Sequence, residues 1–171
     1  MERSDKGQWK CRARLEKRKG DINQCSTPEA RRRFLEQTKP YEVIESEGNL
    51  LLNEGIDAMW TLICGGAETV YSNANARIGV GNGTTAAAAG DTGLVGASTA
   101  FKAIEAGFPT FGSSQKATFK SSFGDTEANF AWNEWTIDNG ATPNKNLNRK
   151  VESLGTKSTG TWTLEVSITI S

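Results

Sequence analysis

The last eleven residues, Thr161 to Ser171, alternate between polar and apolar side chains without a break. Successive side chains of a strand point to opposite faces of its sheet, so this pattern predicts a strand with one buried face. The apolar face consists of Trp162, Leu164, Val166, Ile168 and Ile170. Burying it contributes roughly 8–15 kcal/mol before conformational entropy is subtracted. We therefore expect a mainly β chain.

Further segments have strand patterns of their own. Residues 9–17, WKCRARLEK, alternate cleanly, with the apolar residues on one face. Residues 128–137, ANFAWNEWTI, carry apolar groups on both faces, with Trp132 on one and Trp135 on the other, as in a central strand covered on both sides. Shorter strands are expected at 41–46, 76–81 and 108–123, the last broken by a turn at 112–114. These elements predict a β-sandwich or jelly-roll-like domain.

One segment has helical periodicity. Apolar residues recur at helical spacing in residues 49–64, with Asn49 as the expected N-cap and two glycines after the end. Met59 and Trp60 are expected to pack in the core. One or two further helical turns are expected after Pro28, since proline favours the first helical position. The predicted fold therefore has one packed α-helix.

Charge divides the chain unevenly, although the formal net charge is zero. Residues 1–40 hold 12 Lys and Arg against 6 Asp and Glu, a net charge of +6, and residues 41–171 carry −6. We therefore predict an extended basic N-terminal arm over 1–40, which includes the first strand, and a sandwich-like body over 41–171. Such an arm is expected to meet an anionic partner, either nucleic acid or the acidic body of a neighbouring copy.

The stretch from Arg77 to Thr92, RIGVGNGTTAAAAGDT, resembles a phosphate-binding loop at first sight. A dinucleotide fingerprint needs a βαβ unit, GxGxxG spacing and an acidic residue about 20 positions later, and none of these is present. A Walker loop needs Gly-Lys-Ser/Thr, whereas here Gly83 precedes Thr84 and Thr85. We therefore interpret the glycines at 79, 81 and 83 as residues that allow tight backbone turns at a strand end.

The composition argues against the usual catalytic sites. The chain has no histidine, which removes the commonest general base and the commonest metal ligand. Its three cysteines form no CxxC pair, so a zinc site is not expected. We expect Cys11 and Cys64 to be buried and Cys25 to be exposed, and therefore available for an intermolecular disulfide after release from the cell. The predictions are no enzymatic activity, no cofactor and no metal.

Sequence patterns also argue against a membrane location. No apolar run approaches the ~20 residues that a transmembrane helix needs. The first ten residues lack the apolar core of a secretory signal. We therefore expect a protein that is made in a cytoplasm and does not bind a membrane.

Four segments together resemble a group of small structural proteins of tailed-bacteriophage virions. They are NLLLNEGIDAMWTLICGG, YSNANARIGVGNGTTAAAAGDTGL, TFKSSFGDTEANFAWNEWTIDNG and LNRKVESLGTKSTGTWTLEVSITIS, in this order. The resemblance covers about residues 41–171, most of the chain, and its specificity comes from the ordered set more than from any one piece. It implies a structural component of the virion, made in the host cytoplasm, on either the head or the tail.

Two structural roles follow from this resemblance. The first is a capsid decoration or cement protein that bridges and stabilises shell subunits, with the major capsid protein, other virion proteins and further copies of itself as partners. The alternative is a tail, baseplate or fibre-associated module that is structural or binds the host, for instance with Trp132 or Trp135 stacked on a sugar. Nucleic-acid binding is not favoured, because strongly basic charge is confined to the arm.

The candidate interface residues are all cations, and we expect them to dock onto acidic groups of neighbouring subunits, such as Glu127 or Glu134. Guanidinium groups suit this task because their forked donors bind carboxylates in pairs. The candidates are Lys17, Arg18 and Lys19, Arg31, Arg32 and Arg33 of the arm, and Arg149 and Lys150 beside a turn at Gly155. The alternative is that these cations are solvated surface charges.

Overall fold

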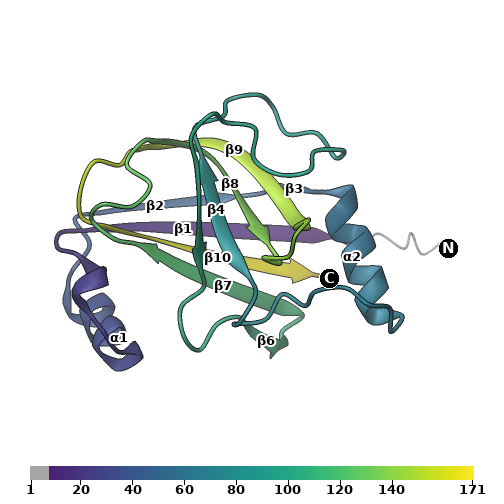
Figure 1. Cartoon of the computed structure of the whole chain (residues 1–171), viewed down its shortest axis with the longest axis horizontal. Helices are drawn as coiled ribbons and strands as arrows, with labels where there is room; N and C mark the ends of the chain where they lie inside the picture. Colours follow the sequence, from purple (N-terminus) through teal and green to yellow (C-terminus); the bar gives the residue numbers. More distant parts are fainter. Residues whose placement is uncertain (1–7) are drawn as a thin grey trace, which may run out of the picture.

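The computed structural model describes residues 8–171. They form two five-stranded antiparallel sheets and two α-helices, which lie at opposite ends of the molecule (Figure 1). The strands are β1 (Trp9–Arg18), β2 (Glu42–Glu47), β3 (Leu50–Leu51), β4 (Arg77–Gly81), β5 (Thr99–Ala103), β6 (Thr110–Ser113), β7 (Lys116–Phe123), β8 (Ala131–Asp138), β9 (Asn146–Thr156) and β10 (Thr161–Ile170). The helical segments are η1 (Ile22–Gln24), α1 (Pro28–Gln37) and α2 (Asn53–Ile63). The prediction of a mainly β, sandwich-like fold is confirmed.

The strand order is β2-β1-β10-β7-β6 in the first sheet and β3-β9-β8-β4-β5 in the second. The core lies between the sheets, where the ring of Trp132 meets those of Phe123 and Trp162 edge-on at centroid distances of 4.9 and 5.0 Å. The predicted alternation of β10 is confirmed, because Trp162, Leu164, Val166 and Ile168 are buried. Only Ile170, at the end of the strand, is half exposed.

The predicted N-terminal arm is not present as an extended segment over residues 8–40. Strand β1 lies inside the first sheet, with Leu15 opposite Leu164 of β10 on one side and Ile44 of β2 on the other. The physical reason is its alternation, since Cys11, Ala13 and Leu15 form part of the core. Residues 1–7, the start of the predicted arm, lie outside the described residues.

The helices differ from the predictions in number and extent. The helical turns expected after Pro28 form a full second helix, α1, and the Thr27 hydroxyl accepts a hydrogen bond from the Ala30 amide at its N-terminus. Helix α2 begins at Asn53, so Asn49 is not its N-cap and instead accepts a hydrogen bond from the Trp9 indole at 2.6 Å. Within residues 8–171, no helix is long and apolar enough to cross a membrane.

Residues 82–98 connect β4 to β5 without regular secondary structure, and we call them the long loop. In Figure 1 it forms the teal excursion at the top of the molecule. Ordered loops of more than about 12–15 residues are uncommon in small domains and often serve a function. Strand β8 is covered on both sides, as predicted: Glu134 and Thr136 of its outward face are fully buried, and Glu134 lies beneath the long loop. The predicted placement of Trp132 and Trp135 on opposite faces is wrong, because the register shift between Trp132 and Glu134 brings both rings into the hydrophobic core.

Candidate functional site

The three alternate glycines at 79, 81 and 83 make room for neighbouring side chains. A Cβ atom on Gly79 would overlap the Phe101 ring, and one on Gly81 or Gly83 would lie 2.5 Å from Oε1 of Glu134. None of the three has a positive φ angle. The interpretation of these glycines as turn residues is therefore wrong, because the constraint is a close approach to Phe101 and Glu134.

The carboxylate of Glu134 is fully buried beneath the long loop. Its Oε1 accepts hydrogen bonds from the backbone amides of Gly83, Val95 and Gly96, at 3.1, 3.1 and 2.7 Å. Its Oε2 accepts a hydrogen bond from Nε of Arg149 at 2.8 Å and lies 2.7 Å from Nη2. One buried side chain thus holds both ends of the long loop against the sheet.

Arg149 completes this arrangement from β9, and its side chain is fully buried. Nη1 donates to Oδ2 of Asp91 at 2.8 Å, and Nη2 donates to the carbonyl oxygen of Thr85 at 3.0 Å. Asp91 also accepts a hydrogen bond from the Ala88 amide, and these donors hold the pKa of Asp91 below its ordinary value. We call Glu134, Arg149 and Asp91, with their bonds to the long loop, the loop clamp.

Of the two cations predicted to dock near the C-terminus, Arg149 is fully buried, so its predicted role is wrong, whereas Lys150 is partly exposed and its role stays a prediction. Arg149 belongs to the loop clamp, and the buried Glu134 offers no surface for docking. Lys150 donates to the carbonyl oxygen of Glu47 at 2.8 Å and pairs with Glu152 at 3.1 Å. Glu127, the other proposed docking carboxylate, pairs with Lys102 at 2.5 Å. These cations and carboxylates stabilise the chain's own fold.

Two of the three cations at 17–19 also bind groups of the chain itself. Nζ of Lys17 donates to Glu42 at 3.0 Å and lies 4.2 Å from the centre of the Trp162 ring. Arg18 is buried, and donates to the carbonyl oxygen of Thr38 at 2.8 Å and to Glu16 at 2.5 Å. Lys19 is exposed and forms no ion pair within residues 8–171.

The three arginines of α1 have different environments. Arg31 points toward the body and binds both carboxylate oxygens of Glu105, at 2.9 and 2.6 Å, a contact that raises the pKa of its guanidinium. Arg32 is exposed and lies 3.8 Å from Glu36 on the same helix. Arg33 is exposed and has no ion pair among the described residues. Of the three, only Arg33 is both exposed and without an ion pair among the described residues.

A different surface emerges at the end of the sandwich beside α2. An apolar hollow of about 500 Å³ opens there between α2 and the β6–β7 hairpin. Met59 and Tyr71 line one side of it, and residues 112–117 line the other. Its floor reaches core residues of both sheets, including Phe119, Leu147 and Ile168. The two sheets thus leave their core partly open at this end.

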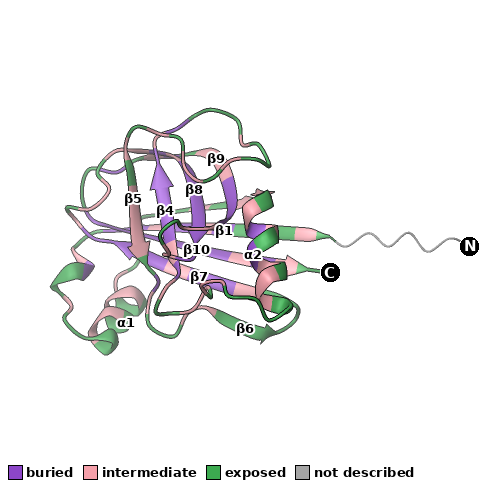
Figure 2. Ribbon diagram, turned by 45° about the vertical axis from the view of Figure 1, so that its right-hand side comes forward, coloured by how far each residue is buried: buried purple, intermediate pink, exposed green. Residues whose placement is uncertain are grey.

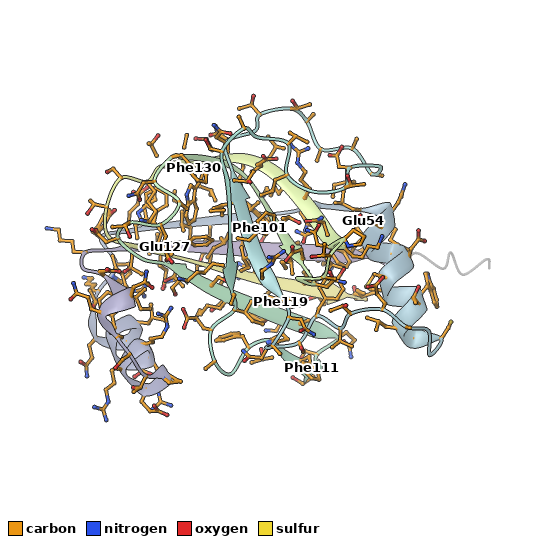
Figure 3. All side chains as sticks on the ribbon, in the orientation of Figure 1. Glu54, Phe101, Phe111, Phe119, Glu127 and Phe130 are labelled. Carbon is orange, nitrogen blue, oxygen red and sulfur yellow. The ribbon has the colours of Figure 1, made fainter. Side chains whose placement is uncertain are left out.

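Several exposed apolar side chains belong to the segments that contribute lining residues to this hollow. Of the eight large apolar residues that are exposed in residues 8–171, Ile170 lines the hollow itself, and four more lie on those segments: Trp60, Ile63, Val70 and Phe111. Phe111 of β6 is 78 % exposed, and it lies at the lower edge of the molecule in Figure 3. Figure 2 shows β6 and much of α2 as exposed and intermediate, beside the buried central strands. We call these five residues and the hollow the apolar face.

The sequence-based reasoning missed this face. It placed Trp60 in the core, but Trp60 is 61 % exposed, and only Met59 packs partly against the core. It expected a buried Cys64, which is exposed, and an exposed Cys25, which is half-buried. The available signal was in α2 itself, because Met59, Trp60 and Ile63 spread apolar residues around more of the helix than one sheet can cover.

The structure contradicts the sugar-binding role considered for Trp132 and Trp135. Trp132 and Trp135 are both fully buried, because the register of β8 against β9 shifts between Trp132 and Glu134. A sugar cannot stack on either ring, so that form of the host-binding alternative is wrong. Within residues 8–171, no group of three or more Cys, Asp or Glu side chains could hold a metal ion.

The chain was compared with family models, with curated proteins and with solved structures, and none of the three comparisons finds a match.

Proposed function

We propose that this chain is a structural protein of a tailed-bacteriophage virion, and that it acts as a capsid decoration or cement protein. In this role many copies coat the shell, and each bridges neighbouring shell subunits. The major capsid protein is the principal partner. The activity is mechanical, since added contact area between subunits helps the shell to resist the pressure of packed DNA.

The observation that carries this proposal is the convergence of the motif residues. Gly81, Gly83 and Asp91 come from one of the segments that carry the resemblance, Glu134 from the next and Arg149 from the last. The fold brings all five into the loop clamp. The shared motifs therefore describe one structural unit, a long loop fixed to a sheet, which supports a resemblance at the level of the fold.

The apolar face supports a role in assembly. Contiguous exposed apolar patches are uncommon on soluble monomers and mark contacts with other proteins. Trp60 and Phe111 are aromatic side chains of the kind that dominate binding energy at protein interfaces. A structural subunit needs such a surface. The same surface suits the alternative location on the tail or baseplate, so the test must separate head from tail.

The proposal is tested on virions purified from the phage whose genome encodes the chain. Quantitative mass spectrometry of density-purified particles should find the chain in many copies relative to the major capsid protein. After osmotic disruption, the chain should stay with the empty heads. Recovery with the tails would replace the cement role by the tail role, and absence from the particles would overturn both.

A further inference from the structure

We infer that Asn82 is a site of spontaneous deamidation that the loop clamp keeps unreactive, so that opening of the long loop leads to an irreversible change in the chain. The inference concerns the asparagine between Gly81 and Gly83, for which the proposed function has no use. It does not depend on a role in the virion.

Asn82 is followed by glycine, and this pair is the one in which an asparagine side chain reacts most readily with the backbone, because glycine has no Cβ to obstruct the approach. The nitrogen of Gly83 forms a bond with Cγ of Asn82 while the Cγ–Nδ2 bond breaks. Nδ2 leaves as ammonia and takes up the proton that the Gly83 nitrogen loses. Water then opens the cyclic imide at either carbonyl group, so the products are aspartate and isoaspartate.

The fold holds both reacting groups in place by hydrogen bonds. The Gly83 amide donates to the buried Oε1 of Glu134 at 3.1 Å. Oδ1 of Asn82 accepts a hydrogen bond from the Ser98 amide at 3.0 Å, and the Asn82 amide donates to the Ser98 carbonyl oxygen, also at 3.0 Å. The Asn82 carbonyl oxygen accepts a hydrogen bond from Nδ2 of Asn133 at 3.3 Å. These bonds oppose the rotations that would bring Cγ over the Gly83 nitrogen.

The proton of the Gly83 amide is also protected. It points to Oε1 of Glu134, which accepts two further amide hydrogen bonds, from Val95 and Gly96, while Oε2 is paired with Arg149. Hydrogen bonds and a neighbouring positive charge favour the ionised carboxylate and so make it a poor acceptor for this proton. Gly83 is itself buried, which restricts the access of hydroxide from solvent.

Local opening of the long loop removes this protection. Segments of a folded protein open with free energies below that of global unfolding, and attack on a rapidly opening segment follows the population of its open form. The long loop is held to the sheet by the hydrogen bonds of Glu134 and Arg149. The rate of deamidation at Asn82 therefore depends on the strength of the loop clamp.

Deamidation prevents the loop clamp from forming again. Oδ1 of Asn82 and Oε1 of Glu134 both lie next to Gly96, so an aspartate at position 82 sets a second negative charge beside Glu134. Like charges in a buried site disfavour each other's ionised form. Isoaspartate instead lengthens the backbone by one carbon atom, which moves the Gly83 amide away from its carboxylate. Either product weakens the attachment of the loop.

The chain contains a second Asn-Gly pair, Asn139–Gly140, which serves as an internal control. Asn139 is fully buried, and its Oδ1 accepts hydrogen bonds from the amides of Ala141 and Lys145, outside the loop clamp. Global unfolding exposes both pairs, whereas opening of the long loop exposes only Asn82. The ratio of the two deamidation rates therefore separates local opening from unfolding.

The inference is tested by peptide mapping with mass spectrometry after incubation in mildly alkaline buffer. Both pairs should convert in guanidinium chloride, and both should stay intact over the same period in the folded, unmodified chain. Glu134→Gln should raise the rate at Asn82 at least tenfold and leave Asn139 unchanged. Asp91→Asn, a milder change to the loop clamp, should act in the same direction and replaces Glu134→Gln if that variant does not fold.

Three outcomes of this experiment would overturn the inference. The first is conversion of Asn82 in the folded, unmodified chain at the rate of the unfolded chain. The second is a rate at Asn82 that the variants of the loop clamp leave unchanged. The third is equal acceleration at Asn82 and Asn139, which would make global unfolding the controlling step.

Asn82→Asp tests whether the modified loop stays open. Amide hydrogen exchange at Gly83, Val95 and Gly96 should be at least tenfold faster in this variant, whereas the amides of β10 should keep their protection. Asn23→Asp, at an exposed asparagine outside the loop clamp, is the control and should leave exchange at these three amides unchanged. Unchanged exchange in Asn82→Asp would contradict the irreversibility.

Discussion

Arg149 and Glu134 form an ion pair in which both side chains are completely buried, with Nε of the arginine 2.8 Å from Oε2 of the glutamate. Neither charge contacts solvent, so each depends on the other and on the backbone groups of the long loop. Removing one partner of a buried pair typically costs about 3–5 kcal/mol, because the remaining charge is left without compensation. This pair makes the long loop part of the folded body.

Replacing the arginine should therefore unfold or strongly destabilise the domain. We expect Arg149→Met to lower the free energy of unfolding by about 3–5 kcal/mol, measured by urea denaturation. The neighbouring Lys150→Met is the matched control and should cost less than about 1 kcal/mol, since Lys150 is partly exposed and its ion pair lies near the surface. Similar losses of unfolding free energy in both variants would show that the burial of the Arg149 ion pair adds nothing to its contribution to stability.

The close approach between Gly81 and Glu134 can be tested by adding a methyl group at the glycine. Gly81→Ala should lower the free energy of unfolding by about 1–3 kcal/mol, because its Cβ would lie 2.5 Å from the Glu134 carboxylate. Gly90→Ala is the control, since no atom lies within 4 Å of its added Cβ and its φ is not positive. It should be neutral or stabilising by up to about 1 kcal/mol. A stable Gly81→Ala protein would contradict the close approach.

Acid should weaken the loop clamp. Hydrogen bonds from the Ala88 amide and from Arg149 lower the pKa of Asp91 in the folded chain. A depressed folded-state pKa stabilises the fold above the unfolded-state pKa, about 3.9, and this contribution disappears as pH falls through the folded-state value. The stability difference between the unmodified chain and Asp91→Asn should therefore be full at pH 7 and vanish in strong acid. A difference independent of pH would reject this linkage.

Arg31 should behave differently from its neighbours. Its paired contact with Glu105 is largely shielded from solvent, so Arg31→Ser should lower the free energy of unfolding by about 1–2 kcal/mol. Arg33→Ser should leave the melting temperature within error, because Arg33 forms no ion pair in the described part of the chain. Thermal unfolding of the two single variants decides the point. Equal melting temperatures would mean that the Arg31 contact contributes little.

The three thiols should react in a defined order. Cys64 is exposed and Cys25 half-buried, whereas Cys11 is buried and its burial raises the pKa of the thiol to about 12. The thiolate is the reactive form, so a maleimide reagent should modify Cys64 first, then Cys25, and should not modify Cys11 in the folded protein. Peptide mapping after timed labelling measures the order. Early modification of Cys11 would contradict its place in the core.

The sequence alone determined the sandwich and much of its core, because alternation along a strand is a local property. Strands β1 and β10 could be predicted from alternation at Cys11, Ala13 and Leu15 and at Trp162 through Ile168, and the start of α1, though not its length, from Pro28. Only the tertiary structure decided which charges are buried and which apolar residues are exposed. Arg149 becomes a core residue because Glu134 and Asp91, 15 and 58 positions away, converge on it. Trp60 and Phe111 remain exposed because no other segment of residues 8–171 packs over them. The burial of Arg149 depends on how distant segments pack, which no local pattern encodes, whereas the spread of apolar residues around α2 gave a local sign that part of that helix would stay uncovered.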